Sequence, residues 1–227
     1  MMLNNDMEKN EIVIQLKNIR KTYDKKKYVL NGIDLSLHKG EMVVIEGKSG
    51  AGKSTLMNVL GLLDEYNDGE YLLYNKKIKK KDYNKIRAKK IGFVFQAYHL
   101  IESISVRENI MLPFLYNDAE IDDEVKMEYE RFLEKFGLKD LENQKTGDLS
   151  GGEKQRVAIV RALIKNPEII IADEPTGNLD IENTNVVIGA FRELKNEGKL
   201  IIIVTHDITI AKEEDRKLYI RNGKIEE

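Results

Sequence analysis

The sequence predicts an α/β fold built around a mainly parallel β-sheet. Short, uninterrupted apolar runs recur along the chain, and segments with helical patterning lie between and after them. An apolar run without polar alternation is typical of a strand that is covered on both faces, as in a parallel sheet. Strands that alternate with helices favour a parallel sheet with helices packed on its faces.

The core strands are expected at residues 42–45, 91–95, 169–172 and 200–204, where most residues are β-branched or otherwise apolar. The expected helices cover residues 53–60, 151–165 and 181–197. The second of these ends before Pro167, because proline cannot continue a helix. The third ends at Gly198, a residue type typical of helix C-caps.

Two regions do not follow this alternation of apolar runs and helices. Residues 12–38 and 71–78 alternate polar and apolar positions, which indicates antiparallel strands with one exposed face. Residues 97–146 are charged and mostly helical, and Ser105 and Glu108 have the spacing of a capping box. We therefore expect one domain over residues 1–227. About 10–95 and 147–227 would form the core with an antiparallel β lobe, and about 97–146 an inserted helical subdomain.

Composition excludes several classes of protein. The chain has 227 residues, of which 41% are hydrophobic, enough for a substantial core. Its net charge of −2 creates no general attraction to nucleic acid, and we expect no such partner. Cysteine is absent, which excludes disulfides and thiolate metal sites. No apolar run approaches the roughly 20 residues that span a bilayer, and the N-terminus does not resemble a signal peptide. We expect a cytoplasmic chain that reaches a membrane only through a partner.

One basic stretch has two interpretations. Residues 76–90 contain nine lysines and arginines against the single acid Asp82. The favoured interpretation is a solvated strand, turn and short helix. The alternative is contact with anionic lipid headgroups or with a membrane partner.

A phosphate-binding loop is expected at residues 47–54, which fit the pattern G-x-x-x-x-G-K-[ST] between an apolar strand and a helix. Its glycines allow backbone amides to surround phosphates, and the helix N-terminus adds positive potential. Lys53 is expected to reach the β- and γ-phosphates, and the Ser54 hydroxyl to bind Mg²⁺. The predicted cofactors are therefore ATP and Mg²⁺. The predicted nucleotide-binding residues here are Gly47, Lys48, Ser49, Gly50, Ala51, Gly52, Lys53, Ser54 and Thr55.

A second feature is the acidic pair Asp173 and Glu174, which ends the apolar run 169–172. Two ionised carboxylates at the end of a buried strand are costly unless a cation offsets them. Asp173 is expected to hold Mg²⁺ through water. Glu174 is expected to act as the base for the attacking water.

A third feature is the helix start at Ser150, Gly151, Gly152 and Glu153. Ser150 and Glu153 fit a capping box. The box does not explain two glycines in a first helical turn, where each costs up to roughly 1 kcal/mol relative to alanine. Bare amides at a helix start suit an anion. The expected loop at residues 47–54 already binds the phosphates of this chain's own nucleotide. We therefore infer that this second anion site serves the nucleotide of a partner chain.

Residues 149–155 resemble the signature motif of ABC-type ATPases. In the order that this family requires, the chain also has the phosphate loop, Gln96, the pair Asp173 and Glu174, the stretch 178–180 and His206. The resemblance covers about residues 12–225. It implies a P-loop NTPase fold with a RecA-like core, and a head-to-tail homodimer with two ATP molecules at its interface.

The resemblance also implies roles for single residues. Gln96 would sense Mg²⁺ and the attacking water, and His206 would hold the γ-phosphate and support Glu174. Ser150 and Gly152 would contact the γ-phosphate of the opposite nucleotide, and Asp180 would couple the two sites. Tyr23 would stack on adenine, although Tyr28 lies close by and the loop between them is short.

Residues 54–61, 91–96 and 172–180 resemble the MacB, LolD and FtsE group within this family. This implies the ATP-hydrolysing subunit of a bacterial ABC transporter on the inner face of the membrane. It would power export or extraction of an antimicrobial peptide, lipoprotein or drug through a MacB/FtsX-like permease. Tyr98 and Tyr116 are expected to line the groove for a helix of that permease.

Two alternatives keep the ATPase chemistry. An FtsEX-like complex would transmit force to a cell-envelope regulator without transport. A soluble ABC ATPase that acts on DNA or ribosomes is disfavoured, because residues 54–149 leave no room for a coiled-coil insertion and the chain has one cassette. The transported substrate and the identity of the permease stay open at this point.

Overall fold

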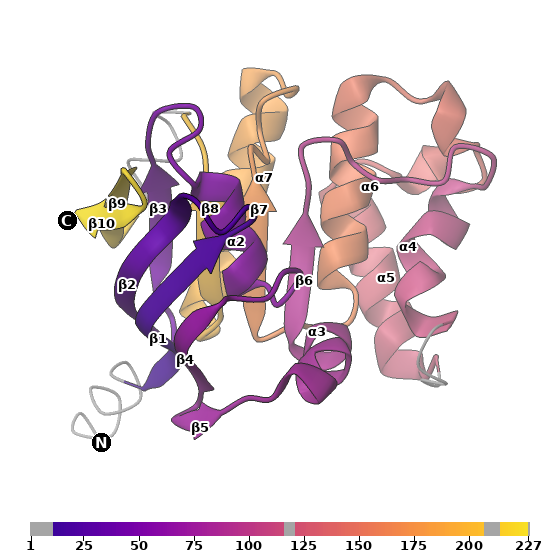
Figure 1. Cartoon of the computed structure of the whole chain (residues 1–227). Helices are drawn as coiled ribbons and strands as arrows, with labels where there is room; N and C mark the ends of the chain where they lie inside the picture. Colours follow the sequence, from indigo (N-terminus) through magenta and orange to yellow (C-terminus); the bar gives the residue numbers. More distant parts are fainter. Residues whose placement is uncertain (1–10, 116–120, 207–213, 227) are drawn as a thin grey trace.

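The predicted apolar runs form the centre of a six-stranded sheet in the computed structural model, which describes residues 11–115, 121–206 and 214–226 (Figure 1). These strands are β3 (Met42–Glu46), β6 (Ile91–Val94), β7 (Ile169–Asp173) and β8 (Leu200–Val204). The sheet order is β10-β9-β3-β8-β7-β6, and β9, β3, β8, β7 and β6 run parallel. The prediction of a parallel core is confirmed.

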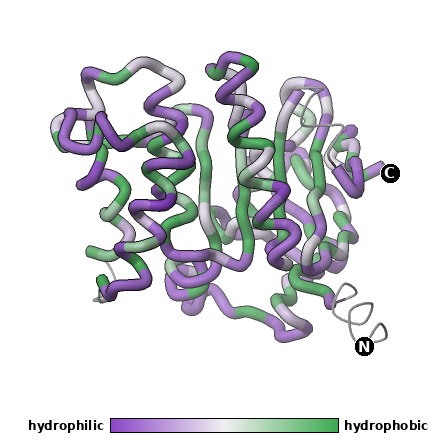
Figure 2. The backbone as a smooth tube through the Cα atoms, turned by 180° about the vertical axis from the view of Figure 1, so that it is seen from behind, coloured by the Kyte–Doolittle hydropathy of each residue, from purple (hydrophilic) through white to green (hydrophobic). Residues whose placement is uncertain are grey.

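Burial on both faces explains why these strands are apolar throughout. In β7, Ile169 and Ile171 pack into the core shared with the first part of the chain, whereas Ile170 and Ala172 pack into the core shared with the later helices. All four side chains are fully buried. Figure 2 shows the hydrophobic residues running through the central strands. Such a strand has no face that could carry polar residues.

A second sheet is antiparallel, as the alternating pattern predicts. It contains β1 (Ile12–Thr22), β2 (Tyr28–His38), β4 (Asp68–Leu73) and β5 (Lys76–Lys77) in the order β2-β1-β4-β5. The alternating segment 71–78 is a hairpin rather than one strand, because Tyr74 and Asn75 both have positive φ, as a tight hairpin turn requires.

Helices cover the parallel sheet on both faces. Helix α2 (Lys53–Leu60) lies on the side of the antiparallel sheet and buries Leu56, Met57, Val59 and Leu60. Helices α6 (Gly151–Leu163) and α7 (Ile181–Asn196) contribute to the other core. These helices begin where the sequence predicts and end within two residues of the predicted positions.

Residues of the basic stretch form β5, the short helix η1 (Lys80–Asp82) and α3 (Tyr83–Lys90). This agrees with the favoured interpretation of a strand, turn and short helix. Lys77, Lys80 and Lys90 pair with Glu70, Glu65 and Glu168.

The segment between β6 and α6 is helical, with α4 (Val106–Leu115), α5 (Asp123–Lys135), η2 (Lys139–Leu141) and η3 (Thr146–Asp148). The predicted capping box at its start is present. The amide of Glu108 donates to Ser105 Oγ at 3.2 Å, and the amide of Ser105 donates to Glu108 Oε2 at 2.8 Å. Helices α4 and α5 pack on α6 through one apolar core. Within the described ranges, no helix has the length and apolarity needed to cross a bilayer.

The C-terminal hairpin is an element that the sequence analysis missed. Strand β9 (Arg216–Arg221) extends the sheet beside β3, and β10 (Lys224–Glu226) pairs with it antiparallel. The signal was available, because Asn222-Gly223 is a strong hairpin turn and both residues have positive φ.

Candidate functional site

The predicted phosphate loop joins β3 to α2 at the carboxyl end of the parallel sheet. Gly47 lies against the C-terminal hairpin, where a Cβ atom would come within 2.6 Å of the carbonyl oxygen of Ile220. Gly52 caps α2 with a φ of 108°, a conformation that other residues rarely adopt. The loop therefore requires glycine at both positions, and its residues 48–50 are exposed.

Lys53 is the first residue of α2, and its side chain turns back over the loop. Its Nζ donates to the carbonyl oxygen of Gly47 at 2.5 Å and to that of Lys48 at 3.2 Å. Ser54 follows as an exposed hydroxyl in the first helical turn. The cation and the hydroxyl thus stand where the loop meets the helix.

Asp173 is the last residue of β7 and Glu174 follows it, two strands away from β3 in the same sheet. Burial and the neighbouring Glu174 raise the pKa of the Asp173 carboxyl, whereas the charge of Lys53 opposes this rise. Because β3, β8 and β7 run parallel, the loop that follows β3 and the carboxyl pair at the end of β7 lie at the same end of the sheet. A half-buried carboxylate of this kind needs a cation.

Glu174 is held by the segment that follows β8. Its backbone has a φ of 45°, and its amide donates to the carbonyl oxygen of Val204 at 2.8 Å. Its Oε2 accepts a hydrogen bond from Thr205 Oγ1 at 2.9 Å and one from the amide of His206 at 3.4 Å. A non-glycine residue in the left-handed region is uncommon and points to a constrained, functional position. Thr205 was not predicted from the sequence, because a single buried threonine after a strand carries no distinctive pattern.

The available ligands fit Mg²⁺. Ser54 and Asp173 supply hard oxygen atoms, and Mg²⁺ typically takes one or two protein oxygens and completes its shell with water and phosphate oxygens. Among the described residues there is no cluster of three or more histidine or acidic side chains that could hold a metal by itself. Any Mg²⁺ here would depend on the nucleotide phosphates.

A cavity of about 940 Å³ adjoins the phosphate loop. Residues 46–51, His206, Tyr28 and the C-terminal hairpin line it. Tyr23, the residue expected to stack on adenine, does not line this cavity. Its exposed ring lies 4.6 Å from Lys21 Nζ, and its hydroxyl donates to Asp64 Oδ2 at 2.8 Å. The structure therefore brings Tyr28, rather than Tyr23, beside the loop, and the role of Tyr23 stays a prediction.

The signature segment caps α6 as predicted. The Ser150 amide donates to Glu153 Oε2 at 2.7 Å, and the Glu153 amide donates back to Ser150 Oγ at 3.4 Å. The Ser150 hydroxyl also donates to Glu153 Oε2 at 2.7 Å, and this bond, together with the one from the Ser150 amide, holds the pKa of the Glu153 carboxyl below its usual range. Ser150 and Gly151 are exposed, and none of Ser150, Gly151 and Gly152 lines the cavity at the phosphate loop. The chain does not bring the two predicted anion sites together.

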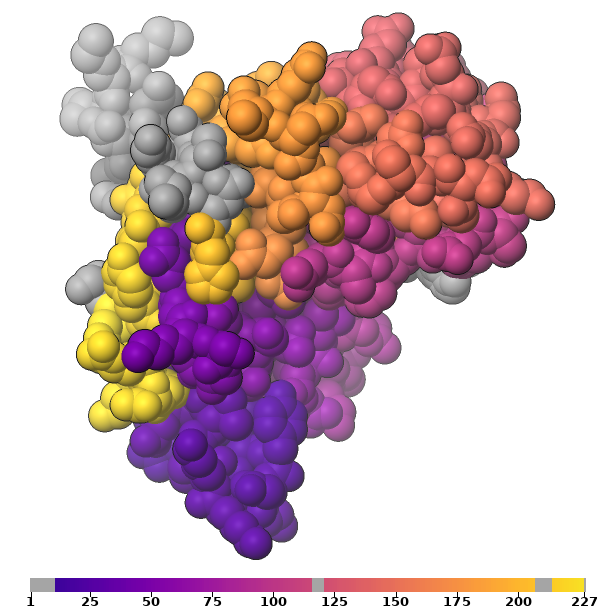
Figure 3. All heavy atoms as spheres, turned by 90° about the horizontal axis from the view of Figure 1, so that it is seen from above, coloured from indigo at the N-terminus to yellow at the C-terminus, as the bar shows by residue number. Residues whose placement is uncertain are grey.

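Asp180 and Gln96 lie at the edges of this region. Asp180 caps α7. Its Oδ1 accepts from the backbone amide of Asn183 at 2.7 Å and from the side-chain amide of Asn183 at 2.9 Å, and these two hydrogen bonds lower the pKa of its carboxyl. Gln96 is exposed just beyond β6. Figure 3 views the molecule from above, looking down on this end of the sheet. The loop near residue 50 (purple) and the segments after residue 150 (salmon and orange) share this face.

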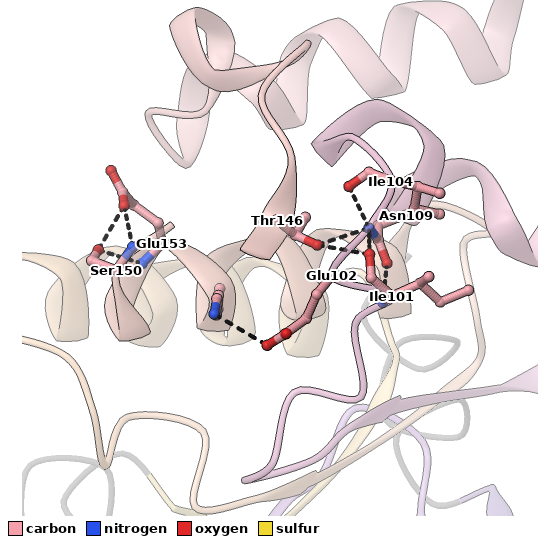
Figure 4. Close-up of polar contacts among 8 residues, drawn as sticks. Ile101, Glu102, Ile104, Asn109, Thr146, Ser150 and Glu153 are labelled. Atoms are coloured by element: carbon pink, nitrogen blue, oxygen red, sulfur yellow. Dashed lines mark hydrogen bonds and ion pairs between the residues drawn. The ribbon is translucent and has the colours of Figure 1, made fainter. Parts of the chain in front are cut away.

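The segment that follows Gln96 is hydrogen-bonded to α6, the helix that begins after Ser150. Arg161, on α6, donates to the carbonyl oxygens of Tyr98 and His99 at 2.6 and 2.5 Å. Further along, the fully buried Asn109 accepts from the Ile101 amide at 2.8 Å and donates to Thr146 Oγ1 at 3.1 Å (Figure 4). The predicted groove residue Tyr98 thus lies beside α6, and Tyr116 lies outside the described residues.

A glycine-rich loop at a helix start, its lysine, and a carboxylate pair at the same end of one parallel sheet together define a P-loop NTPase. The chain belongs to the ABC transporter family, whose model matches residues 30–177. It is 45% identical over 219 residues to the ABC transporter ATP-binding protein YvrO of Bacillus subtilis (strain 168). That match covers 94% of this chain and 95% of that protein.

Two further similarities bear on assembly. The chain is 40% identical to the macrolide export ATP-binding/permease protein MacB of Pasteurella multocida (strain Pm70); the match covers 95% of this chain but only 34% of that longer protein. A solved structure, described as a dimeric post-hydrolysis state of the ATP-binding cassette MJ0796 bound to ADP and Pi, has a TM-score of 0.86 and 38% identity. That match covers 94% of this chain and 97% of the solved chain.

Proposed function

We propose that this chain is the ATP-hydrolysing subunit of a bacterial ABC export or extraction complex. One observation carries this proposal: Lys53, at the start of α2, and Asp173 and Glu174, at the end of β7, lie at the same end of the parallel sheet, and Glu174 is oriented by Thr205 and by the amide of His206. A base held in this way beside a phosphate loop suits the hydrolysis of a nucleoside triphosphate.

Each group has a chemical role in this proposal. The amides of residues 47–55 and the Lys53 ammonium bind the phosphates of ATP. Ser54, Asp173 and Gln96 would hold Mg²⁺, which would neutralise the charge that develops on the phosphate oxygens. Glu174 orients the attacking water and takes its proton. His206, on the rim of the same cavity, holds the γ-phosphate and keeps Glu174 in place.

The site is completed by a second copy of the chain. Residues 150–152 begin a helix, where an anion is favoured, and Ser150 and Gly151 are exposed, yet none of the three lines the cavity at this chain's own phosphate loop. A head-to-tail homodimer would place them on the nucleotide of the other chain, with Asp180 between the two sites. The dimeric state of the MJ0796 cassette supports this arrangement.

The proposed partner is an integral permease of the MacB/FtsX-like kind, which would hold the chain at the inner face of the membrane. MacB combines an ATP-binding part and a permease in one protein, and this chain matches about a third of its length. The relatives named for export favour transport over force transmission without transport. The helical segment 97–146 would form the lobe that carries movements between the permease and Ser150.

The experiment compares Glu174→Gln with Lys53→Ala in light scattering with Mg²⁺ and ATP. Glu174→Gln retains every phosphate contact but lacks the base, so it should accumulate as a dimer. Lys53→Ala should stay monomeric, because it loses the charge that binds the phosphates. A Glu174→Gln chain that binds ATP and remains monomeric would overturn the proposed composite site.

A further inference from the structure

A cavity of about 440 Å³ lies between one face of α5 and the C-terminal ends of α4, α6 and α7. Its lining is separate from that of the cavity at the phosphate loop. The floor is apolar and consists of buried side chains, namely Phe114, Phe132, Leu163, Ile164 and Leu194. A cavity of this size, with an apolar and aromatic floor, is typical of sites that bind small organic molecules.

Only one of the four helices runs along this cavity. Helix α5 contributes lining residues from several of its turns, whereas α4, α6 and α7 contribute only from their last turns or from just beyond them. Helices α4 and α5 lie beside α6 in the helical lobe, as Figure 1 shows. A peptide helix would need a groove that extends along several turns of its neighbours. The short walls therefore favour a small molecule over a peptide.

The rim of the cavity is more acidic than basic. The ionisable side chains in the lining, among the residues that the structure describes, are Asp122, Glu124, Glu128 and Glu197 against Arg131 and Lys165. Charge of one sign around a cavity with apolar walls attracts a ligand of the opposite sign. A cationic ligand is therefore favoured over an anionic one.

Both cations of the rim already have partners in the chain. Arg131 donates to Glu128 Oε2 at 2.7 Å, and Lys165 Nζ lies 3.4 Å from the carbonyl oxygen of Pro113. Each cation also lies over an aromatic ring of the floor, 4.9 Å from the ring centre for Arg131 and 5.5 Å for Lys165. These two cations are thereby engaged within the chain.

Two carboxylates of the rim are less well compensated. Neither Glu124 nor Glu197 forms an ion pair with a residue in the described ranges. The charge of Glu197 acts on Arg131 and helps its hydrogen bond with Glu128 to raise the pKa of that guanidinium. The rim therefore has room for a further positive charge beside Glu124 and Glu197.

The helix ends add to this negative potential. Ile164 is the C-cap of α6 and Glu197 is the C-cap of α7, and both line the cavity. The C-terminus of a helix carries a partial negative charge, which favours a cation. The positive end of α5 also lies here, but Asp122 caps it and accepts from the Val125 amide at 2.9 Å.

We propose that this cavity binds a small organic cation with an apolar body, whose charged group pairs with Glu124 or Glu197 and whose body covers the floor. This goes beyond the ATPase function, because none of its residues belongs to the nucleotide site. The cavity is nevertheless connected to that site, since α6 begins after Ser150 and α7 after Asp180. A ligand here would contact the far ends of the two helices that begin at the proposed interface between chains.

The test titrates the full chain with 1-naphthylmethylamine and follows the naphthyl protons by saturation-transfer difference NMR, with and without excess ADP. A ligand of this size should bind with a Kd on the order of 1 mM, and ADP should leave this value unchanged. The probe 1-naphthylacetate has the same ring and the opposite charge, so it should bind at least about tenfold more weakly.

Glu124→Gln with Glu197→Gln should weaken binding of the amine about fivefold, because both changes remove exposed charges that pair with it. The matched control is Glu130→Gln with Glu134→Gln, two exposed glutamates of α5 outside the cavity, which should leave the affinity unchanged. Val125→Trp, a change in the wall of the cavity, should abolish binding of the amine by filling the space.

Several outcomes would overturn the proposal. They are equal binding of 1-naphthylacetate, an unchanged affinity in Glu124→Gln with Glu197→Gln, or no saturation by about 10 mM amine. Binding that ADP abolishes would also overturn it, because the ring would then lie in the nucleotide site. The ATP-driven dimerisation of Glu174→Gln is measured separately, so failure of this proposal and failure of the ATPase function can be told apart.

Discussion

Asn109 offers the clearest quantitative test of how the segment after Gln96 is attached. Its side chain is fully buried at the start of α4 and lies between Ile101 and Thr146 (Figure 4). It accepts from the Ile101 amide at 2.8 Å and donates to the Ile101 carbonyl oxygen at 3.0 Å and to Thr146 Oγ1 at 3.1 Å. One amide thereby joins the loop after Gln96 to the segment before Ser150.

The cost of Asn109→Ala follows from which groups lose their partners. The Ile101 carbonyl oxygen retains the hydroxyl of Thr146 at 2.9 Å, so it stays satisfied. The Ile101 amide would lose its Asn109 partner, but Ile101 is 45% exposed, so water can replace part of that bond and the cost lies near the lower end of the roughly 1–3 kcal/mol of an unsatisfied buried group. With the other lost hydrogen bonds, each contributing about 1 kcal/mol, we expect a loss of about 2–4 kcal/mol of unfolding free energy. This is a large share of a typical total of about 5–15 kcal/mol.

Urea unfolding followed by circular dichroism measures this loss, and hydrogen exchange at the Ile101 amide locates it. Thr146→Val removes only one hydroxyl and should lose about 1 kcal/mol, whereas Thr146→Ser should be close to the wild type. A loss below about 0.5 kcal/mol in Asn109→Ala, with the Ile101 amide still protected, would refute the reasoning.

Three further outcomes are expected. Asp173→Asn should make the isolated chain more stable at neutral pH, because the raised pKa of this carboxyl shows that folding disfavours its charged form; the same variant should lose Mg²⁺-dependent hydrolysis, and an unchanged melting temperature would count against the first part. Gly47→Ala should lose ATP affinity, measured by fluorescent-nucleotide titration, because its Cβ would press on the Ile220 carbonyl oxygen at 2.6 Å. The pKa of Asp180 is lowered, so the stability that its cap contributes is present above the ordinary aspartate pKa and is lost as the pH falls through the lowered value. The difference in unfolding free energy between Asp180→Asn and wild type, measured as a function of pH, should therefore shrink as the pH falls.

Much of the fold could be predicted because its signals are local. The four apolar runs, the proline and glycine stops and the capping box at Ser105 each specify an element through nearby residues. The hairpin at β9 and β10 was missed although Asn222-Gly223 marks its turn, because its strands are short and partly exposed.

The site was predictable in its residue types and less so in its contacts. The phosphate loop and the pair Asp173–Glu174 have spacings that fix their chemistry. Thr205 could not be found, because only the pairing of β7 with β8 brings its hydroxyl to Glu174. The sequence also favoured Tyr23 over Tyr28 beside the nucleotide, and the structure places Tyr28 in the lining of the cavity. Which ring contacts a base depends on how the loop between them folds, which the pattern does not specify.

The central claim is that Ser150 and the phosphate loop of different chains share one ATP. The chain contains no cysteine, so introduced cysteines give unambiguous cross-links. We would mix Ser49→Cys chains with Gly151→Cys chains in a Glu174→Gln background and add a short bismaleimide. The account predicts a cross-linked product between the two kinds of chain only with Mg²⁺ and ATP. A lack of any ATP-dependent product, or equal products between two Ser49→Cys chains, would contradict it.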